Sequence, residues 1–320
     1  MATALPLLIA LMSACSADPE PAATTAPPIT STPDSSTPAT STGPPRIASA
    51  ATAVPDAASP ADRPYDVVVP SDYTGTTALP LVLGLHGYAA TGAEIDSYLG
   101  LLPLVDDRGF LYVSPDGSAD SRGTLFWDAT DACCNFTGAP LDDAGYLADL
   151  ISQVQADYAV DPARIYVVGH SNGGFMAYRM ACEHADLVAA IVSIAGATFA
   201  DPDGCAPDAP VSVLQIHGDA DEVISYSGGD FPAPYPGALD SVATWAGYDQ
   251  CEAGPAPLAP PRDLEANLPG PESTATAFEG CAGGSAVELW TVGGGAHVPA
   301  LSPSFPDQVV DWLYAHPKQR

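Results

Sequence analysis

The sequence has 320 residues and carries 9 Lys or Arg against 39 Asp or Glu, so its formal net charge is −30 at pH 7. Nucleic-acid binding depends on Lys and Arg that neutralise phosphates, and this composition argues against it. No run of Asp, Asn and Gly has the spacing of a calcium-binding loop. We therefore expect a solvated acidic surface, with neither a metal nor another cofactor.

The first 15 residues predict an export signal. Residues 4–12 are apolar but far shorter than the roughly 20 residues that a membrane span needs. The next residues, MSAC, resemble a bacterial lipobox, in which the cysteine becomes the lipidated N-terminus. The sequence thus favours a protein that is secreted or anchored through Cys15 at the outer face of a bacterial envelope. A plain cleaved signal peptide is the alternative.

Residues 16–61 predict a linker. They are Pro, Ser, Thr and Ala with almost no large apolar residue. Such a segment cannot bury enough apolar surface to offset the entropy lost on ordering, so we expect an extended tether. The folded domain then covers residues 62–320.

Within that domain, short apolar runs alternate with segments of helical periodicity. The predicted strands are residues 65–69, 79–85, 109–114, 165–168, 189–194, 211–216 and 287–292. The predicted helices are residues 143–158, 175–181, 236–248 and 305–315. Residues 126–143 predict an irregular loop, and the Pro-rich residues 252–271 an irregular surface segment. This alternation predicts an α/β fold with a mostly parallel sheet covered by helices on both faces.

The segment RIYVVGHSNGG contains the strongest functional signal. A β-branched and aromatic run leads into Gly169-His170-Ser171-Asn172-Gly173, which matches G-x-S-x-G, and helical periodicity follows. A serine at such a strand-to-helix turn is a nucleophile elbow. Glycines are needed on both sides of Ser171 because the strand turns tightly back on the helix. The sequence predicts Ser171 as a catalytic nucleophile, and a structural turn is the alternative.

A nucleophilic serine needs a histidine base and a carboxylate that orients this base. Of the six histidines, His297 alone lies in a loop after the last predicted strand, behind three glycines. Asp219 and Asp221 both follow the strand at residues 211–216. Asp221 lies further out and can reach the imidazole, whereas Asp219 can cap the turn. We predict the triad Ser171, Asp221, His297, in the chain order of an α/β-hydrolase.

His86-Gly87-Tyr88 closes an early strand, where hydrolases of this class place part of the oxyanion hole. We expect the backbone N–H groups of Tyr88 and Asn172 to bind the oxyanion, and a simple turn is the alternative.

Six cysteines besides Cys15 suggest three disulfides in an oxidising compartment. The placement of Cys251 and Cys281 around the Pro-rich segment predicts one bond between them. Cys133 and Cys134 are adjacent, so we expect one to pair with Cys182 and the other with Cys205, in an order left open.

With these residues in place, the domain resembles the secreted polyhydroxybutyrate-depolymerase and feruloyl-esterase family. The resemblance rests on PLVLGLHG, DDAGYLADLI, DPARIYVVGHSNGGFMAYRMACE, HGDADEVISY and VELWTVGGGAH, which occur in family order. It implies Asp221 as the triad acid. Near the histidine the chain departs from the family, because Ala296 intervenes and Val298-Pro299-Ala300 replaces the usual Trp-Pro-Gly. This change affects the pocket more than the chemistry.

The sequence therefore predicts a secreted serine carboxylesterase whose substrate is a polyhydroxyalkanoate, feruloyl or related ester or polyester, with no metal. Two alternatives remain: a serine peptidase of the same fold, and a non-catalytic module that binds polymers at a surface. The oligomeric state stays open.

Overall fold

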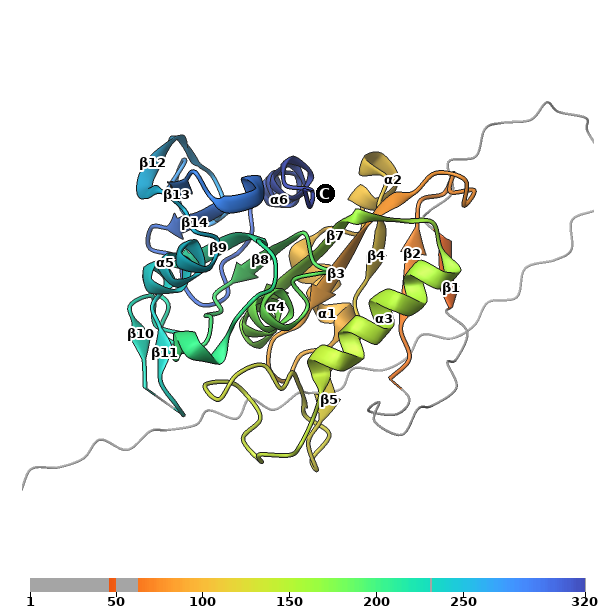
Figure 1. The fold of residues 1–320 in the computed structure, drawn as a ribbon, viewed down its shortest axis with the longest axis horizontal. Helices are drawn as coiled ribbons and strands as arrows, with labels where there is room; N and C mark the ends of the chain where they lie inside the picture. Colours follow the sequence, from red (N-terminus) through yellow and green to blue (C-terminus); the bar gives the residue numbers. More distant parts are fainter. Residues whose placement is uncertain (1–45, 50–62, 231, 320) are drawn as a thin grey trace, which may run out of the picture. The chain divides into compact units, whose positions relative to one another are not determined.

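The predicted apolar strands join into one sheet, which has ten strands in the described part of the chain (Figure 1). The structure is a computed structural model that describes residues 46–49, 63–230 and 232–319. The predicted export signal with Cys15, and the predicted linker apart from residues 46–49, lie outside the described residues. The strand order is β1-β2-β4-β3-β7-β8-β9-β14-β13-β12. These strands are β1 (Arg46–Ser49), β2 (Asp66–Val69), β3 (Leu79–Leu85), β4 (Leu111–Val113), β7 (Val160–His170), β8 (Ala190–Ile194), β9 (Ser212–Gly218), β12 (Ala253–Arg262), β13 (Ser273–Glu279) and β14 (Val287–Val292).

The six strands from β4 to β14 in the middle of this order pair in parallel, and β1, β2, β13 and β12 are antiparallel to their neighbours. Two small ladders lie outside the sheet: β5 (Ser118–Ala119) with β6 (Leu125–Phe126), and β10 (Gly228–Gly229) with β11 (Tyr235–Pro236). Because parallel strands end at the same edge, the segments after β3, β7, β9 and β14 all leave from one edge of the sheet. Each predicted site residue of the triad and oxyanion turn follows one of these strands.

Alternate side chains of the strands enter two separate cores. Leu81, Leu83 and Leu85 of β3 belong to one core with α3, α4 and α5, whereas Val82 belongs to the other with α1, α2 and α6. Figure 1 shows α2 and α6 on one side of the sheet and α3 and α4 on the other. The helices are α1 (Gly92–Leu99), α2 (Leu104–Arg108), α3 (Asp143–Asp157), α4 (Asn172–Glu183), α5 (Ala238–Tyr248) and α6 (Phe305–Ala315), with short 3₁₀ turns η1 (Pro202–Gly204) and η2 (Ala282–Gly284). The predicted α/β fold with helices on both faces is confirmed.

The main difference from the sequence prediction lies between α5 and β14. Residues 252–271 were predicted as irregular, yet β12 forms there and pairs with β13, a strand that the sequence did not predict. The side chains of β12 are almost all exposed. Prolines lack an N–H and are tolerated in a sheet at its edge, which is where this strand lies. The prediction of a surface segment thus holds, but the prediction that it is irregular is wrong.

The sheet also extends into the predicted linker. Arg46–Ser49 pairs antiparallel with Asp66–Val69, so these four residues have regular backbone structure where the composition suggested none. The sequence prediction also omitted α1 and α2.

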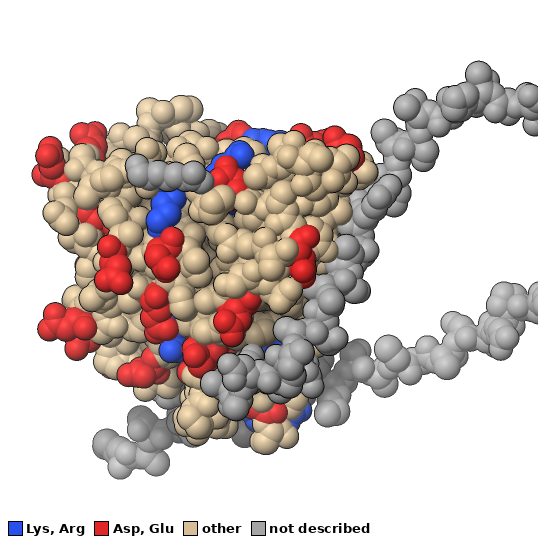
Figure 2. All heavy atoms as spheres, turned by 45° about the vertical axis from the view of Figure 1, so that its right-hand side comes forward, with Lys and Arg blue, Asp and Glu red and all other residues tan. Residues whose placement is uncertain are grey.

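The described surface is acidic. Figure 2 shows Asp and Glu side chains spread over the visible face, with few Lys or Arg among them. None of the described helices is long and apolar enough to cross a membrane.

Candidate active site

The turn at Ser171 has the geometry of a nucleophile elbow. Strand β7 ends at His170 and α4 begins at Asn172, so Ser171 is the N-cap residue, with φ 54° and ψ −119°. A Cβ on Gly169 would lie 2.1 Å from the carbonyl oxygen of Gly173, and a Cβ on Gly173 would lie 2.1 Å from that of Leu85. Side chains at either glycine would therefore force the strand, the helix and β3 apart. The positive φ at a serine is strained, and such strain is concentrated at functional sites.

His297 lies between Ser171 and Asp221. Its Nε2 is 2.9 Å from Ser171 Oγ, and its Nδ1 is 2.8 Å from Asp221 Oδ2. A carboxylate accepts but does not donate, so Nδ1 carries the proton and Nε2 is free to accept from the serine hydroxyl. Three residues far apart in the sequence thus form one chain of hydrogen bonds in the expected order. The structure brings together all three residues of the predicted triad.

The Asp221 carboxylate is fully buried and accepts several hydrogen bonds. Its Oδ1 accepts from the backbone N–H groups of Val223 at 2.8 Å and Ile224 at 2.9 Å. Burial alone would raise the pKa of Asp221, but hydrogen bonds from His217, His297 and the Val223 N–H outweigh it and lower the pKa below its ordinary value. Asp221 is therefore ionised at neutral pH, as an orienting carboxylate must be.

Asp219 occupies a different position. Its side chain is exposed, and its Oδ1 accepts from the backbone N–H of Gly294 at 2.6 Å. Gly294 belongs to the glycine turn between β14 and His297, and its φ is 77°. Asp219 thus fastens the turn that precedes His297, whereas Asp221 contacts the imidazole itself. This geometry supports Asp221, and not Asp219, as the partner of His297.

His170 holds the backbone of His297. Its Nε2 is 2.8 Å from the carbonyl oxygen of His297, and the two imidazole ring centres are 5.1 Å apart. A carbonyl only accepts, so Nε2 of His170 carries a proton. Burial lowers the pKa of His170 to about 4, although the hydrogen bond to His297 opposes this shift. His170 is therefore neutral at pH 7 and acts as a fixed donor to the loop that carries His297.

The predicted oxyanion turn lies against the nucleophile. A Cβ on Gly87 would be 3.4 Å from Ser171 Cβ, so the turn from His86 to Tyr88 packs on the serine. His86 is fully buried; its Nε2 accepts from the N–H of Gly117 at 2.9 Å, and its Nδ1 donates to the carbonyl of Gly87 at 2.7 Å. Burial lowers the pKa of His86, which keeps the ring neutral in this role. His86 thus fixes the shape of the turn that presents the backbone of Tyr88.

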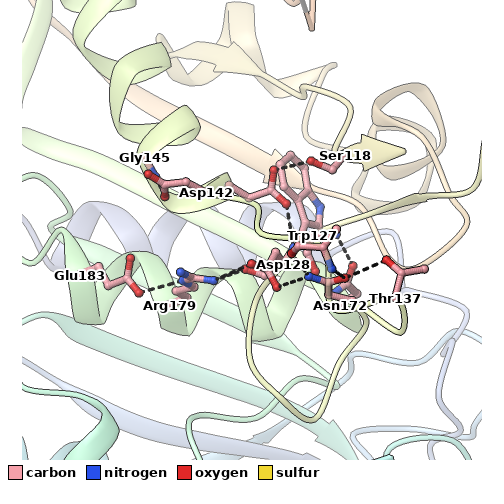
Figure 3. Close-up of polar contacts among 12 residues, drawn as sticks. Ser118, Trp127, Asp128, Thr137, Asp142, Gly145, Asn172, Arg179 and Glu183 are labelled. Atoms are coloured by element: carbon pink, nitrogen blue, oxygen red, sulfur yellow. Dashed lines mark hydrogen bonds and ion pairs between the residues drawn. The ribbon is translucent and has the colours of Figure 1, made fainter. Parts of the chain in front are cut away.

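Trp127 links Asn172 to the turn that contains Tyr88, a connection that the sequence did not reveal. The Asn172 side chain accepts from the Trp127 N–H at 2.7 Å and donates to the Trp127 carbonyl at 2.9 Å (Figure 3). The buried indole Nε1 of Trp127 donates to the carbonyl of His86 at 3.1 Å. Trp127 therefore ties the first residue of α4 to the turn after β3. The side-chain role of Asn172 was not predictable because its partner is 45 residues away.

The loop around Trp127 is held by further polar contacts. Asp143, at the start of α3, accepts from the hydroxyl of Ser118 at 2.9 Å and from the backbone N–H of Asp128 at 2.7 Å. On the other side, Arg179 of α4 donates to the carbonyl of Asp128 and to Glu183 at 2.8 Å (Figure 3). The loop between β6 and α3 was predicted as irregular, and it is irregular but tightly anchored.

The disulfides differ in part from the predicted pairing. Cys251 and Cys281 are bonded, as predicted. Cys182, near the end of α4, is bonded to Cys205, and Cys133 is bonded to its neighbour Cys134. The expectation that Cys133 and Cys134 each reach one of the other two is therefore wrong. The expectation assumed that adjacent cysteines do not pair with each other. In the structure they do, and Cys182 and Cys205, whose Cα atoms lie 5.6 Å apart, an ordinary disulfide distance, pair with each other.

A pocket of about 300 Å³ opens beside Ser171 and His297. Its other lining residues are mostly apolar or aromatic, including Tyr88, Ile95, Tyr98 and Val298. Val298, which stands where the family usually has Trp, is exposed at the pocket. No group of His, Cys, Asp and Glu in the described part of the chain could hold a metal ion. The site therefore offers a partly buried base, an oriented hydroxyl and a mostly apolar pocket.

Comparison with known proteins supports the fold. Residues 80–222, which include Ser171 and Asp221, match the family model described as "alpha/beta hydrolase fold". The chain has the α/β-hydrolase fold. It is 28% identical over 240 residues to "Feruloyl esterase B" of Piromyces equi, which covers 72% of this chain and 42% of the relative. It is 31% identical over 232 residues to "Putative esterase NocK" of Nocardia uniformis subsp. tsuyamanensis, which covers 68% of this chain and 64% of the relative.

This α/β-hydrolase thus spans less than two thirds of the length of those two relatives. Among solved structures, it resembles "Acetyl xylan esterase from Aspergillus awamori" with a TM-score of 0.60 and 18% identity, over 84% of this chain and 99% of that one. "Crystal Structure of a Thermostable Esterase" gives a TM-score of 0.53 and 17% identity, over 80% of this chain and 59% of that one. At these identities the likeness shows the α/β-hydrolase fold alone.

Proposed function

We propose that this α/β-hydrolase is a serine carboxylesterase. The observation that carries the proposal is the chain of hydrogen bonds from Ser171 through His297 to the buried, ionised Asp221. A serine hydroxyl becomes nucleophilic when a neighbouring base accepts its proton as it attacks. The two relatives, a feruloyl esterase and a putative esterase, support ester hydrolysis as the reaction.

In the proposed mechanism, Ser171 Oγ attacks the ester carbonyl while its proton passes to His297 Nε2. Asp221 stabilises the imidazolium that forms, and His297 then gives the proton to the departing alcohol. Water, deprotonated by His297, attacks the acyl-enzyme in turn and releases the acid together with Ser171. No step needs a metal or an organic cofactor.

We further propose that the backbone N–H groups of Tyr88 and Asn172 bind the oxyanion. Asn172 is the first residue of α4, where backbone N–H groups have no partner within the helix. A Cβ added at Gly87 would be in van der Waals contact with Ser171 Cβ, so the turn lies against the serine, which supports a contribution from Tyr88. Donors fixed in place before the reaction stabilise the developing charge without reorganisation.

The pocket favours an acyl group that is apolar or aromatic. Tyr88 and Tyr98 supply ring faces, while Ile95 and Val298 supply aliphatic surface. We propose feruloyl and hydroxyalkanoate esters, including polyesters, as the substrate class. The disulfides favour an oxidising compartment, and we propose that the protein is secreted or anchored through a lipidated Cys15 outside a bacterial cell.

The decisive experiment combines labelling with a substrate panel. The purified protein should react with a fluorophosphonate probe at Ser171, and Ser171→Ala should not. A panel of p-nitrophenyl acetate, p-nitrophenyl butyrate, methyl ferulate, a hydroxybutyrate oligomer and a matched p-nitroanilide amide should show hydrolysis of esters and little of the amide. Preferred cleavage of the amide would identify a peptidase. Absence of both labelling and turnover would favour a polymer-binding module.

A further inference from the structure

His217, at the end of β9, contacts the proposed acid but lies outside the proposed proton path. It is 2% exposed. Its Nε2 is 2.8 Å from the carbonyl oxygen of Ile224 and 3.3 Å from Asp221 Oδ2. Its Nδ1 is 3.1 Å from Nε2 of Gln215, which lies two residues earlier on the same strand and is fully buried. A second imidazole therefore touches the same carboxylate oxygen as His297.

The contacts of Gln215 determine which nitrogen of His217 carries the proton. The Gln215 amide nitrogen lies 2.8 Å from the carbonyl oxygen of Gly196, to which it must donate. The same nitrogen faces His217 Nδ1 with its second N–H, so Nδ1 accepts. Since Nδ1 is an acceptor, the proton of a neutral His217 is on Nε2. This N–H is shared between the Ile224 carbonyl and Asp221, both of which only accept.

This arrangement also prevents His217 from competing with His297 for a proton. A proton on Nδ1 of His217 would point at the Gln215 N–H, so the charged imidazolium has no acceptor there. Nδ1 of His297, by contrast, donates to Asp221, and its Nε2 faces the serine.

We propose that Gln215 and His217 form a positioning pair for Asp221. The pair fixes the carboxylate towards His297, keeps the loop after Asp221 closed through the Ile224 carbonyl, and remains neutral while His297 takes the serine proton. The inference rests on the proposed esterase function. It concerns residues that contact the acid and not the substrate, so it assigns positioning and not catalysis.

The surroundings of His217 contain few other titratable groups. Tyr226, from the same loop, packs edge-on against the ring with ring centres 5.7 Å apart, and its hydroxyl pairs with Thr291 of β14 at 2.7 Å. His297 after β14 contacts the same carboxylate, and burial keeps His170 at the end of β7 neutral. Asp221 is therefore the single charged group in contact with His217 among the described residues.

The test compares His217→Leu with His217→Gln in the full chain, using p-nitrophenyl butyrate. Leu fills the space without a donor, whereas the Gln amide nitrogen can replace Nε2 of the imidazole. We expect His217→Leu to lower kcat about ten- to a hundredfold with little change in KM, because the Asp221 carboxylate is no longer held in the orientation that contacts His297. We expect His217→Gln to stay within about threefold of the wild type.

The pH profile of kcat/KM separates positioning from simple loss of folding. Without the His217 donor, more of the negative charge of Asp221 acts on His297, so the acidic limb of the His217→Leu profile should move to higher pH. Active-site titration with a fluorophosphonate corrects both variants for misfolded protein. Unchanged kcat and an unchanged acidic limb in folded His217→Leu would overturn the proposal, as would equal impairment of His217→Gln.

Gln215→Met provides a second route if His217→Leu does not fold. It removes the amide that blocks protonation of Nδ1, so His217 can take a proton and pair with Asp221. The acidic limb should then become steeper, since two protons inactivate the enzyme where one did before. An unchanged slope would contradict the role of Gln215. A wild-type protein with no ester turnover and no labelling at Ser171 would refute the proposed function itself, an outcome distinct from all of these.

Discussion

Two regions of the site are held in place by different means. One is the set of strand ends that carry Ser171, Asp221 and His297, and the other is the loop from β6 to α3. Ser171 directly follows β7, and Asp221 and His297 lie in the segments after β9 and β14. These strands belong to the parallel part of the sheet. The loop has no such register, and Trp127 is held by two hydrogen bonds with Asn172 and one to His86. The sheet thus brings the triad residues to one edge, with Asp219 and His170 fastening the segment of His297. The geometry of the loop depends on individual side chains alone.

This difference explains which parts of the site tolerate change. A side-chain substitution in the strand-end region removes a chemical group and leaves the frame intact, so its effect appears in the rate. A substitution in the loop removes one of a few anchors, so its effect is smaller and spreads over neighbouring groups. The predictions below test this contrast, from the largest expected effect to the smallest.

The largest effect should come from Asp221→Asn. An amide in place of the carboxylate favours the wrong tautomer of His297, and loss of this orientation costs about 10⁴-fold in kcat in a serine triad. The matched control is Asp219→Asn. Because an amide oxygen can still accept from the Gly294 N–H, the control should keep most of the activity. Steady-state kinetics on a p-nitrophenyl ester decides; a larger loss of rate in Asp219→Asn at equal folding would reverse the assignment.

The next prediction contrasts two disulfides by their effect on stability. Cys251 and Cys281 are separated by 30 residues, and their bond restricts the unfolded chain by about 3–4 kcal/mol in the chain-entropy model. Replacing both with Ala should lower the free energy of unfolding by this amount. The bond between Cys133 and Cys134 closes almost no loop, so the same replacement there should cost far less stability. Urea unfolding of both double variants provides the measurement, and equal losses would contradict the entropic account.

The same contrast explains what the sequence could predict. Strands β3 and β14 and helix α6 have the bounds that periodicity predicted, because their apolar patterns are local. The chain of Ser171, His297 and Asp221 was predictable because each residue follows a recognisable strand. Other contacts each depend on a particular side chain: the pairing of Cys182 with Cys205, the hydrogen bonds between Trp127 and Asn172, and the contact of His217 with Asp221. No local pattern records such contacts. The strand β12 was not predicted because it contains several prolines, which usually indicate irregular structure.

A pH-dependent effect should come from His170, which belongs to the strand-end region. Its pKa is lowered by burial from 6.5 to about 4 in the folded protein, so the unfolded chain binds this proton more readily. The contribution of neutral, buried His170 to the free energy of unfolding is therefore fully present above pH 6.5 and is lost as the pH falls towards 4. At about pH 4.5 this group should lower the free energy of unfolding by about 2.5 kcal/mol relative to neutral pH.

His170→Gln isolates this contribution because Gln does not titrate but can still donate to the His297 carbonyl. The free energy of unfolding of the wild type and the variant should be compared in urea at neutral pH and at about pH 4.5. The wild type should lose about 2.5 kcal/mol more than His170→Gln between these two conditions. Parallel losses in the two proteins would show that burial of His170 does not contribute to acid sensitivity.

The smallest effect should come from the loop. Trp127→Phe keeps a buried aromatic ring and both backbone contacts with Asn172, and removes the indole N–H that donates to the His86 carbonyl. The turn that presents Tyr88 should then be less rigid, without loss of either proposed oxyanion donor. Removal of a whole oxyanion donor costs about 10²–10³-fold in kcat, so a loosened one should cost about tenfold with little change in KM.

Trp245→Phe is the matched control for this variant. Trp245 is also fully buried, and its indole N–H also donates to a backbone carbonyl, that of Val211, at 2.9 Å. It lies on α5, apart from the pocket residues, so its replacement should lower stability by a similar amount and leave kcat unchanged. If Trp127→Phe lowered stability without lowering kcat, the loop would be a structural cover. If both variants lowered kcat equally, general loosening of the core, and not the contact with His86, would set the rate. A loss of kcat confined to Trp127→Phe would show that the loop acts on the reaction through the oxyanion turn.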